Sequence, residues 1–421
     1  MEASAHDAPD ATGGAGSAPA PVPAPERHAG WNELFFDLIA VAGVGQLAHL
    51  LHSGPTWGDL ALYGVLYAAF WITWAGFVVY GDVAAGTART SVLLGAMSGM
   101  AVMAAAVHSI GSGGTDTVQA VSFVLAYAAL RWLAGRVWQR GSVVTDWPLA
   151  QIGTGAAPWL ASLFVDDPWR YRLWALGIAL DLFALFAFSR ERALRQAQDR
   201  RVREDARPQH GRRQHVPEGR PRLHEAHTDA AHLAERLGLY VIIVLGEGVI
   251  QVIDAAADLE DWTPRLAATG VAALALLASL WTLSLLYGSN GVPHLRSRVL
   301  SPRLVMLLHA VSTAALAALA AGLGIAVAHA DSVLPAPARW LVCAALTLYF
   351  TLGLLAALPA RPRPAWIAAW ALPCILVPLA VAAFGARLPT WGVVLALFAT
   401  VAWQILYHSG PPGTTDAEDP A

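Results

Sequence analysis

The chain has 421 residues, of which 56% are hydrophobic and only 14% are charged, and its formal net charge is −3. Soluble domains carry about 25% charged residues, so this chain has too few charges to cover a surface that faces water. The composition therefore excludes an ordinary soluble protein and predicts a protein embedded in a membrane.

Apolar runs of the length needed to cross a bilayer follow one another along the chain. A helix rises 1.5 Å per residue, so a hydrocarbon core ~30 Å thick takes about 20 residues. The runs cover residues 33–51, 57–80, 90–110, 117–138, 147–165, 171–189, 232–254, 265–288, 303–328, 338–358, 364–385 and 390–407. The sequence thus predicts an all-α, polytopic transmembrane bundle of about 12 spanning helices. The fifth run is interrupted by Pro148 and Pro158, and the eleventh by Pro373 and Pro378.

Polar segments divide these runs into two halves. Residues 1–29 are rich in Ala, Pro, Gly and Ser and lack the apolar stretch of a signal peptide, which predicts a disordered tail. The first transmembrane half covers 30–189 and the second covers 231–407, with six predicted helices in each. An arginine-rich loop at 190–230 joins the halves, and a second tail covers 408–421.

The distribution of arginine predicts the orientation in the membrane. All 27 basic residues are arginine, and eleven of them lie in the loop 190–230. Because cytoplasmic loops carry an excess of basic residues, this loop is expected in the cytoplasm. Six crossings on either side of it then place both termini in the cytoplasm as well. Nucleic-acid binding is not expected, because no folded element presents this charge.

The two halves begin in a similar way. Glu33 lies at the start of the first predicted helix of the first half, and Glu235 lies at the corresponding place in the second half. Two parallel repeats of six helices are a common plan among transporters. The match between the halves is short, so the sequence leaves open whether they are repeats.

Charged residues inside the first and seventh runs are the main candidates for function. Glu33 and Asp37 are four positions apart and share one helix face, with Asp37 about one turn into the membrane. Arg236 and Glu247 are eleven positions apart and also share a face. With Arg236 at the cytoplasmic interface, this separation places Glu247 ~16 Å deeper, near the bilayer midplane. An unpaired charge at that depth costs several kcal/mol, so such a carboxylate is a candidate proton carrier or cation ligand.

The other candidates are polar residues in or beside the spanning runs: Gln251, Asp181, His232 and Glu235. Structural interpretations stay open beside the functional ones. Glu33 and Arg236 could cap helices or form an ion pair at the membrane interface. Asp37 could stabilise the fold by pairing with an arginine on another helix.

No metal or cofactor site is predicted. His224 and His227 are three positions apart, but they belong to an arginine-rich loop, whereas zinc needs ligands fixed in tetrahedral geometry. Cys343 and Cys374 both lie in apolar runs, which argues against a disulfide framework or a cysteine metal site. The chain has no phosphate-binding glycine loop, no nucleophile elbow and no Cys-x-x-Cys.

Two motifs resemble the signatures of the bacterial low temperature requirement A family. Residues 31–38 read Trp-Asn-Glu-Leu-Phe-Phe-Asp-Leu and resemble the opening signature W-x-E-L-F-F-D-L. Residues 232–239 and 242–247 read His-Leu-Ala-Glu-Arg-Leu-Gly-Leu and Ile-Ile-Val-Leu-Gly-Glu, and resemble H-x-x-E-R-x-G-L followed by I-I-x-L-G-E. The resemblance extends to about residue 407, except for the arginine-rich insert. It implies a multipass protein of the bacterial inner membrane and supplies no reaction or substrate.

Three functions remain open from the sequence. The first is a transporter or ion-coupled permease that moves protons, cations or a small molecule through buried carboxylates. The second is a non-catalytic sensor or scaffold that supports growth in the cold. The third is an intramembrane enzyme acting on a lipid or isoprenoid, which needs a polar cluster near one membrane interface. The only partner that the sequence itself implies is the lipid bilayer, and it leaves the oligomeric state open.

Overall fold

A computed structural model describes the chain at residues 30–52, 54–84, 89–110, 117–136, 142–144, 147–150, 153–187, 224–226, 228–289, 292–293 and 300–409. The predicted tail 1–29 and nearly all of the predicted loop 190–230 lie outside these residues, as does the second tail from residue 410 onward. His227 also lies outside them, so the structure does not bear on the expectations for these parts of the chain.

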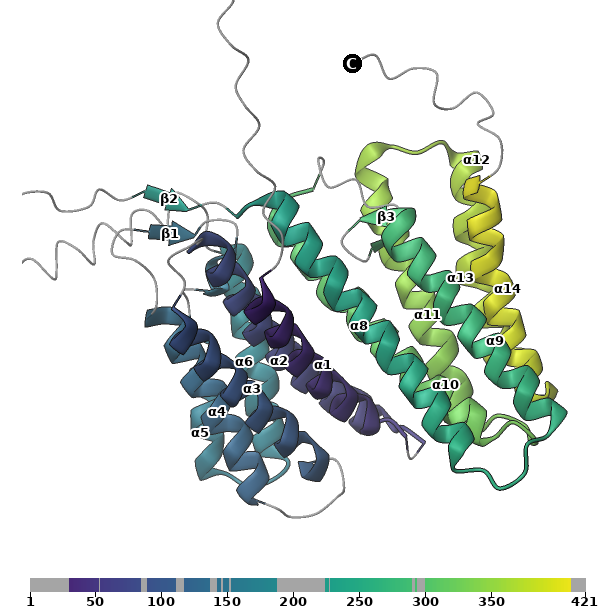
Figure 1. Ribbon diagram of the computed structural model, residues 1–421, viewed down its shortest axis with the longest axis horizontal. Coiled ribbons are helices and arrows are strands. Elements are labelled where there is room, and N and C mark those ends of the chain that lie inside the picture. The colour runs from purple at the N-terminus through teal and green to yellow at the C-terminus, as the bar shows by residue number, and fades with distance from the viewer. Residues whose placement is uncertain are drawn as a thin grey trace, which may run out of the picture.

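The first half consists of helices that run up and down beside one another, coloured purple to blue in Figure 1. They are α1 (Trp31–His49), α2 (Trp57–Val83), α3 (Thr90–Ile110), α4 (Thr117–Arg136), α5 (Ala156–Ala161) and α6 (Trp169–Ala187). Local capping sets where α2 begins. The Asp59 amide donates to the Thr56 hydroxyl, and the Thr56 amide donates back to the Asp59 carboxylate.

The second half forms the green and yellow part of Figure 1. Its helices are α8 (Ala230–Ala257), α9 (Pro264–Trp281), α10 (Pro302–Ala328), α11 (Ala336–Ala357), α12 (Pro364–Trp366), α13 (Leu372–Phe384) and α14 (Thr390–Ser409). π-Helical turns extend α9 over Thr282–Leu286 and join α12 to α13 over Ile367–Ala371. Helices α9 and α10 each begin with a proline. Proline has no backbone N–H, and at the first position of a helix that group would lack a partner within the helix.

Short strand pairs accompany the helices. Strand β1 (Ser142–Val144) pairs in parallel with β2 (His224–Ala226), and β3 (Gly288–Ser289) pairs antiparallel with β4 (Val292–Pro293). Each strand has two or three residues. The fold is therefore a helical bundle, as the composition predicted.

Nine helical segments among the described residues are long and apolar enough to span a membrane. They match the second, third, fourth and seventh to twelfth of the predicted runs. Helices α1 and α6 occupy the first and sixth runs with 19 residues each, but they fall outside this set. Both carry charge within the helix: Glu33 and Asp37 in α1, and Arg170, Arg172 and Asp181 in α6.

The fifth run differs from the expected continuous helix. Over 147–165 the chain forms a 3-10 turn at Pro148–Ala150, the short helix α5, and a second 3-10 turn at Ser162–Phe164. Proline removes a backbone donor and clashes with the preceding turn, so Pro148 and Pro158 oppose one unbroken helix here. The segment still packs inside the first half, where α5 contacts α4 and α6.

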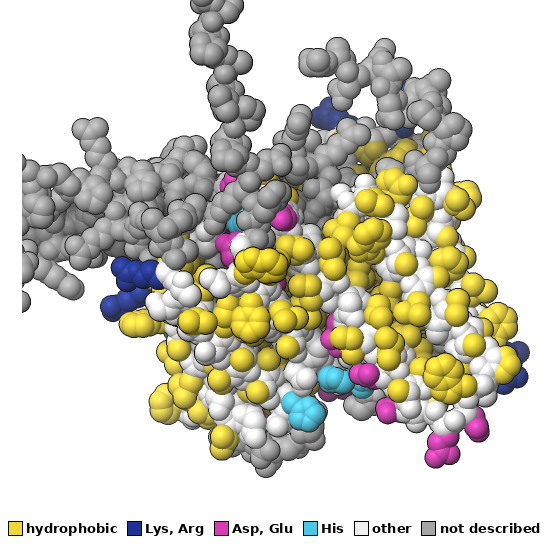
Figure 2. All heavy atoms as spheres, in the orientation of Figure 1, with side chains coloured by type: hydrophobic (Ala, Val, Ile, Leu, Met, Phe, Trp, Pro, Cys, Tyr) yellow, Lys and Arg dark blue, Asp and Glu magenta, His cyan; other side chains and the backbone are white. Residues whose placement is uncertain are grey.

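The two halves meet along α1 and α2 on one side and α8 and α10 on the other. Helices α1 and α8 run parallel, because residues near their starts are in contact and residues further along are in contact as well. Figure 2 shows apolar side chains over the surface of both halves, and acidic and histidine side chains gathered between them. This junction contains the polar residues described next.

Candidate functional site

A buried ion pair joins the start of α1 to α8. Arg236 donates from Nε to Asp37 Oδ2 at 2.9 Å and from Nη2 to Asp37 Oδ1 at 2.6 Å. The Trp74 indole of α2 also donates to Asp37 Oδ1, at 2.8 Å. Both charged side chains are at most 1% exposed. Asp37 is therefore held by an arginine of another helix, which is the structural interpretation left open from the sequence.

A histidine lies between two carboxylates beside this pair. His232 Nδ1 is 2.7 Å from Asp82 Oδ1, and His232 Nε2 is 3.3 Å from Glu33 Oε2. The Asp229 amide donates to the other oxygen of Asp82 at 2.7 Å. Gly81 leaves room for Glu33, because a Cβ at that position would lie 3.1 Å from Glu33 Oε1.

We call these residues, Glu33, Asp37, Asp82, His232 and Arg236, the Arg236 cluster. Arg236 Nη1 also lies 3.6 Å from Glu33 Oε1, so the whole cluster is one electrostatic unit. Three carboxylates, one arginine and one histidine are thus buried together in one site.

A second polar group lies further along α8. Glu247 is 8% exposed, and its Oε1 accepts a hydrogen bond of 2.6 Å from Gln251 Nε2. No described residue forms a salt bridge with Glu247. The carboxylate lies against Gly45 of α1, where a Cβ would approach it to 2.9 Å. Glu247 thus lies at the junction of the halves without a cationic partner of the kind that Asp37 has.

His52, just past the end of α1, belongs to the same group. Its Nδ1 donates to the Ala48 carbonyl at 3.3 Å, and its ring also interacts with Gln251. Burial lowers the pKa of His52, and the neighbouring His49 lowers it further. We call Glu247, Gln251 and His52 the Glu247 group.

Asp181 forms a third buried site, inside the first half. It accepts hydrogen bonds from Arg131 Nη2 at 3.1 Å, from the Gly155 amide at 3.1 Å and from the Tyr127 hydroxyl at 3.2 Å. Arg131 also donates to the Leu149 carbonyl at 3.0 Å. These contacts supply partners to the backbone on both sides of the break between Ala150 and α5, so they stabilise the interrupted fifth segment.

The structure brings together most of the residues that the sequence singled out. Glu33, Asp37, His232 and Arg236 meet in one cluster, and Glu247 and Gln251 meet in another. Asp181 stands apart from both, and Glu235 lies beside Arg236 with a partly exposed side chain.

Sequence reasoning missed three residues of these sites: Asp82, Trp74 and His52. Asp82 lies two positions past the end of the second apolar run, and α2 extends beyond that run to include it. A carboxylate at the end of a spanning run was the available signal. Trp74 carried no such signal, because an indole in a spanning helix is ordinary there.

Comparison with known proteins gives one match. The family model described as "Bacterial low temperature requirement A protein (LtrA)" matches residues 28–403. No curated protein and no solved structure matches the chain.

Proposed function

The chain belongs to the bacterial low temperature requirement A family. From the surroundings of its buried carboxylates, we propose that it is a proton-coupled permease in which Glu247 binds the coupled proton. The family and the apolar helices show a multipass membrane protein.

The observation that carries this proposal is the contrast between Asp37 and Glu247. Asp37 accepts hydrogen bonds from Arg236, whereas Glu247 accepts one from the neutral amide of Gln251. An ionised carboxylate that is largely removed from water and has no cationic partner costs several kcal/mol. Binding a proton or a cation relieves this cost, and such exchange is what an ion-coupled permease needs.

The position of Glu247 supports the proposal as well. The residue lies past the middle of α8, between the two halves, with its carboxylate against the backbone of α1. A site between two packed halves changes its surroundings when the halves move relative to each other. Transporters commonly place coupling sites at such interfaces.

The packing of the helices supports two repeats, a possibility that the sequence left open. In the first half α1 packs on α3, α3 on α4, α5 on α6 and α2 on α6. The second half has matching pairs in the same chain order: α8 with α10, α10 with α11, α13 with α14 and α9 with α14. We propose that the halves are six-helix repeats, with α1 and α8 as equivalent helices.

The arginine distribution supports an orientation for this permease. The chain ends and the loop 190–230 would lie in the cytoplasm of a bacterium, and the membrane would be the inner one. The Arg236 cluster would then lie at the cytoplasmic end of α1 and α8, and the Glu247 group would lie deeper, toward the other side.

Proton flux in reconstituted liposomes tests the function. The wild-type protein is expected to acidify the lumen when a potassium gradient with valinomycin sets the interior negative. Glu247→Gln keeps the hydrogen-bonding capacity and removes the titrating group, so it is expected to abolish this flux. Membrane insertion and thermal stability should stay close to the wild type.

Asp254→Asn is the matched control, because Asp254 lies on the same helix two turns further along and is exposed. Its flux should equal that of the wild type. Wild-type liposomes that acidify no faster than protein-free ones would overturn the permease, and a scaffold role would then fit better. Equal flux in wild type and Glu247→Gln would remove Glu247 from the pathway.

An intramembrane enzyme is the second candidate, because the Arg236 cluster is the polar cluster that such an enzyme needs. His232 contacts a carboxylate through each ring nitrogen, an arrangement that suits general acid–base chemistry. A deletion strain would then accumulate or lose a lipid species. Identical lipid extracts from the deletion strain and its parent would contradict this candidate.

A further inference from the structure

The Glu247 group reaches from the interior of the molecule to its surface. Glu247 and Gln251 are 8% and 4% exposed, His52 is half-buried, and the neighbouring His49 is exposed. The ring centroids of His52 and His49 are 4.8 Å apart. These side chains therefore lead from a buried carboxylate to an exposed histidine.

Helix α10 holds His52 and Gln251 beside each other. A Cβ at Gly324 of this helix would lie 3.4 Å from His52 Nε2 and 3.4 Å from the Cβ of Gln251, so both residues pack against the same point of α10. The His52 ring interacts with the Gln251 side chain. Because His52 Nδ1 bonds to the Ala48 carbonyl, Nε2 is the ring atom that can face Gln251.

The amide of Gln251 can bond to Glu247 and to His52 at the same time, because it donates through nitrogen and accepts through oxygen. Its nitrogen donates to Glu247 Oε1 at 2.6 Å, which suits an ionised carboxylate, and its oxygen can then accept from a protonated His52 ring. With the amide reversed, the oxygen accepts from a protonated Glu247 and the nitrogen donates to a neutral ring. Each orientation therefore fits one proton on the pair.

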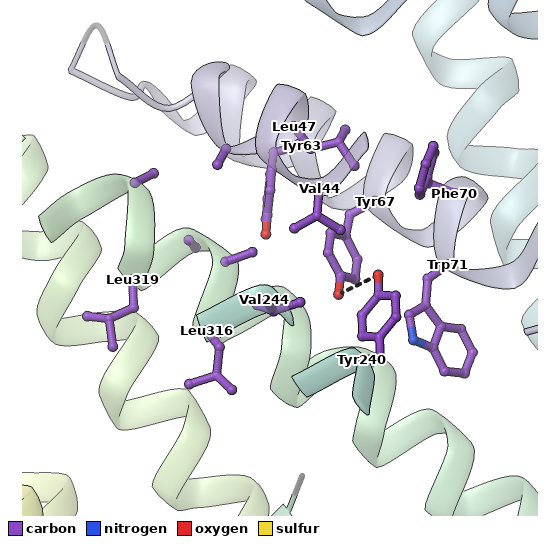
Figure 3. Close-up of a cluster of buried hydrophobic side chains, with 14 of the residues drawn as sticks. Val44, Leu47, Tyr63, Tyr67, Phe70, Trp71, Tyr240, Val244, Leu316 and Leu319 are labelled. Atoms are coloured by element: carbon purple, nitrogen blue, oxygen red, sulfur yellow. Dashed lines mark hydrogen bonds between the residues drawn. The ribbon is translucent and has the colours of Figure 1, made fainter. Parts of the chain in front are cut away.

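Apolar packing separates this group from the Arg236 cluster. Figure 3 shows the buried side chains that fill the junction of the halves, among them Val44, Leu47, Val244, Leu316 and Leu319. Val244 lies between Arg236 and Glu247 along α8. The polar neighbours of Glu247 thus lie on the side of His52.

Few other titratable groups act on His52. Among the described residues, the two that interact with it electrostatically are His49 and Glu247. Helix α10 presents a glycine at the contact. Asp59 and Tyr63, in the first two turns of α2, form their hydrogen bonds with the helix cap and with α10. The charge of His52 is therefore linked to that of Glu247.

We infer that Glu247 and His52 hold one exchangeable proton between them, and that the Gln251 amide reverses when the proton passes from one to the other. For its role in transport this inference rests on the proposed function. When Glu247 releases the proton, its O–H bond breaks and an N–H bond forms on His52, so a neutral pair becomes a carboxylate and an imidazolium. His52 exchanges this proton with the outer side, where the link between α1 and α2 lies in the proposed orientation.

Infrared titration of the protein in liposomes measures this sharing. The carboxylic C=O band that Glu247→Gln removes reports the proton on Glu247. His52→Gln removes the cation that favours the ionised carboxylate, so the band should persist to a higher pH than in the wild type. His52→Arg supplies a permanent cation, so the band should disappear at a lower pH. The two variants are expected to differ by about one pH unit or more.

Proton flux and the connecting amide are tested with the same variants. His52→Arg holds Glu247 ionised, so flux at neutral pH should fall by about tenfold, which corresponds to the weaker proton binding. Gln251→Met keeps the size of the side chain and removes its hydrogen bonds. In that background the difference between the two His52 variants should shrink, and an undiminished difference would overturn the role of Gln251.

His329 provides the matched control. It lies just past the end of α10, it is half-buried, and its Nδ1 bonds to the Ile325 carbonyl at 2.9 Å, as His52 Nδ1 bonds to Ala48. His329→Gln and His329→Arg should keep the infrared titration and the flux of the wild type.

The outcomes separate this inference from the proposed function. Displacement of the band in opposite directions by His52→Gln and His52→Arg supports the shared proton. A band lost at the same pH in both variants overturns it and leaves the permease, provided that Glu247→Gln is inactive. Opposite displacements in a protein without proton flux overturn the permease and leave the shared proton. A wild type without the band overturns both.

Discussion

Asp37 and Arg236 lie 199 positions apart in the chain, and their side chains form two hydrogen bonds that join α1 to α8. The two helices belong to different halves, so this pair connects the halves at one end. The neighbouring contact between Glu33 of α1 and His232 of α8 joins the same two helices. Glu247, further along α8, contacts α1 and forms no ion pair with any residue that the structure describes.

Asp37→Asn is expected to destabilise the protein. The substitution removes the negative charge that faces the buried guanidinium of Arg236. Breaking one side of a buried pair in this way costs about 3–5 kcal/mol. We expect a lower melting temperature in detergent and a lower amount in the membrane. Flux per folded molecule is the quantity to compare with that of Glu247→Gln.

The double variant Asp37→Leu with Arg236→Met serves as the control for this pair. It replaces both charges with apolar side chains of similar size, which is often neutral or stabilising. Stability should recover in part in the double variant, because Glu33 still loses its contact with Arg236. A double variant as unstable as Asp37→Asn would show that the pair acts through more than its charges.

Gly45→Ala is expected to reduce flux with little loss of stability. A Cβ at this position would lie 2.9 Å from the Glu247 carboxylate, so that carboxylate has to move. The end of a flexible side chain moves at small cost, and we expect less than about 1 kcal/mol in stability. Proton flux in liposomes measures the effect on the site.

Gly246→Ala is the matched control, because no atom lies within 4 Å of a Cβ built at Gly246. Alanine in a helix interior is more stable than glycine by up to about 1 kcal/mol. This variant should retain flux and gain stability. Equal flux in Gly45→Ala and Gly246→Ala would contradict the placement of Glu247 against Gly45.

His52 is expected to make the protein less stable in acid. Its pKa in the folded protein is lower than the ordinary value of 6.5, because burial and His49 disfavour the charged form. Below that ordinary value the unfolded chain binds the proton more readily, so stability falls as the pH drops from 7 to 5. His52→Gln should show a smaller decrease in melting temperature over this range.

The wild-type protein, measured over the same range of pH, provides the comparison. An unchanged dependence in His52→Gln would show that His52 is not among the groups that destabilise the folded protein in acid.

Asp181→Asn is expected to destabilise the first half. The side chains of Asp181 and Arg131 are both at most 3% exposed. Removal of the charge of Asp181 from this buried pair costs about 3–5 kcal/mol. Limited proteolysis should then cut preferentially near the interrupted fifth segment. Asp59→Asn, at an exposed helix start, should cost only about 1 kcal/mol or less. Equal proteolysis of the two variants would contradict a role of Asp181 in holding that segment.

The placement of the helices was predictable from the sequence, because it depends on local properties. Runs of apolar residues of bilayer length produce helices in nearly the expected ranges, such as 90–110 and 302–328. The interruption at Pro148 and Pro158 was visible as well, since proline acts on its own backbone. The prediction that this run is a spanning helix was wrong, because the chain instead forms 3-10 turns around a short helix.

The partners of the buried charges came only from the tertiary structure. The sequence identified both Asp37 and Glu247 as candidates, and for Asp37 it left open a pairing with an arginine on another helix. Which one meets a cation depends on how α1, α2 and α8 cross, and residues 199 positions apart carry no local signal of that crossing. Asp82 and His52 joined the sites for the same reason. Hydrophobic length is a property of each segment alone, whereas the pairing of charges is a property of the packed halves.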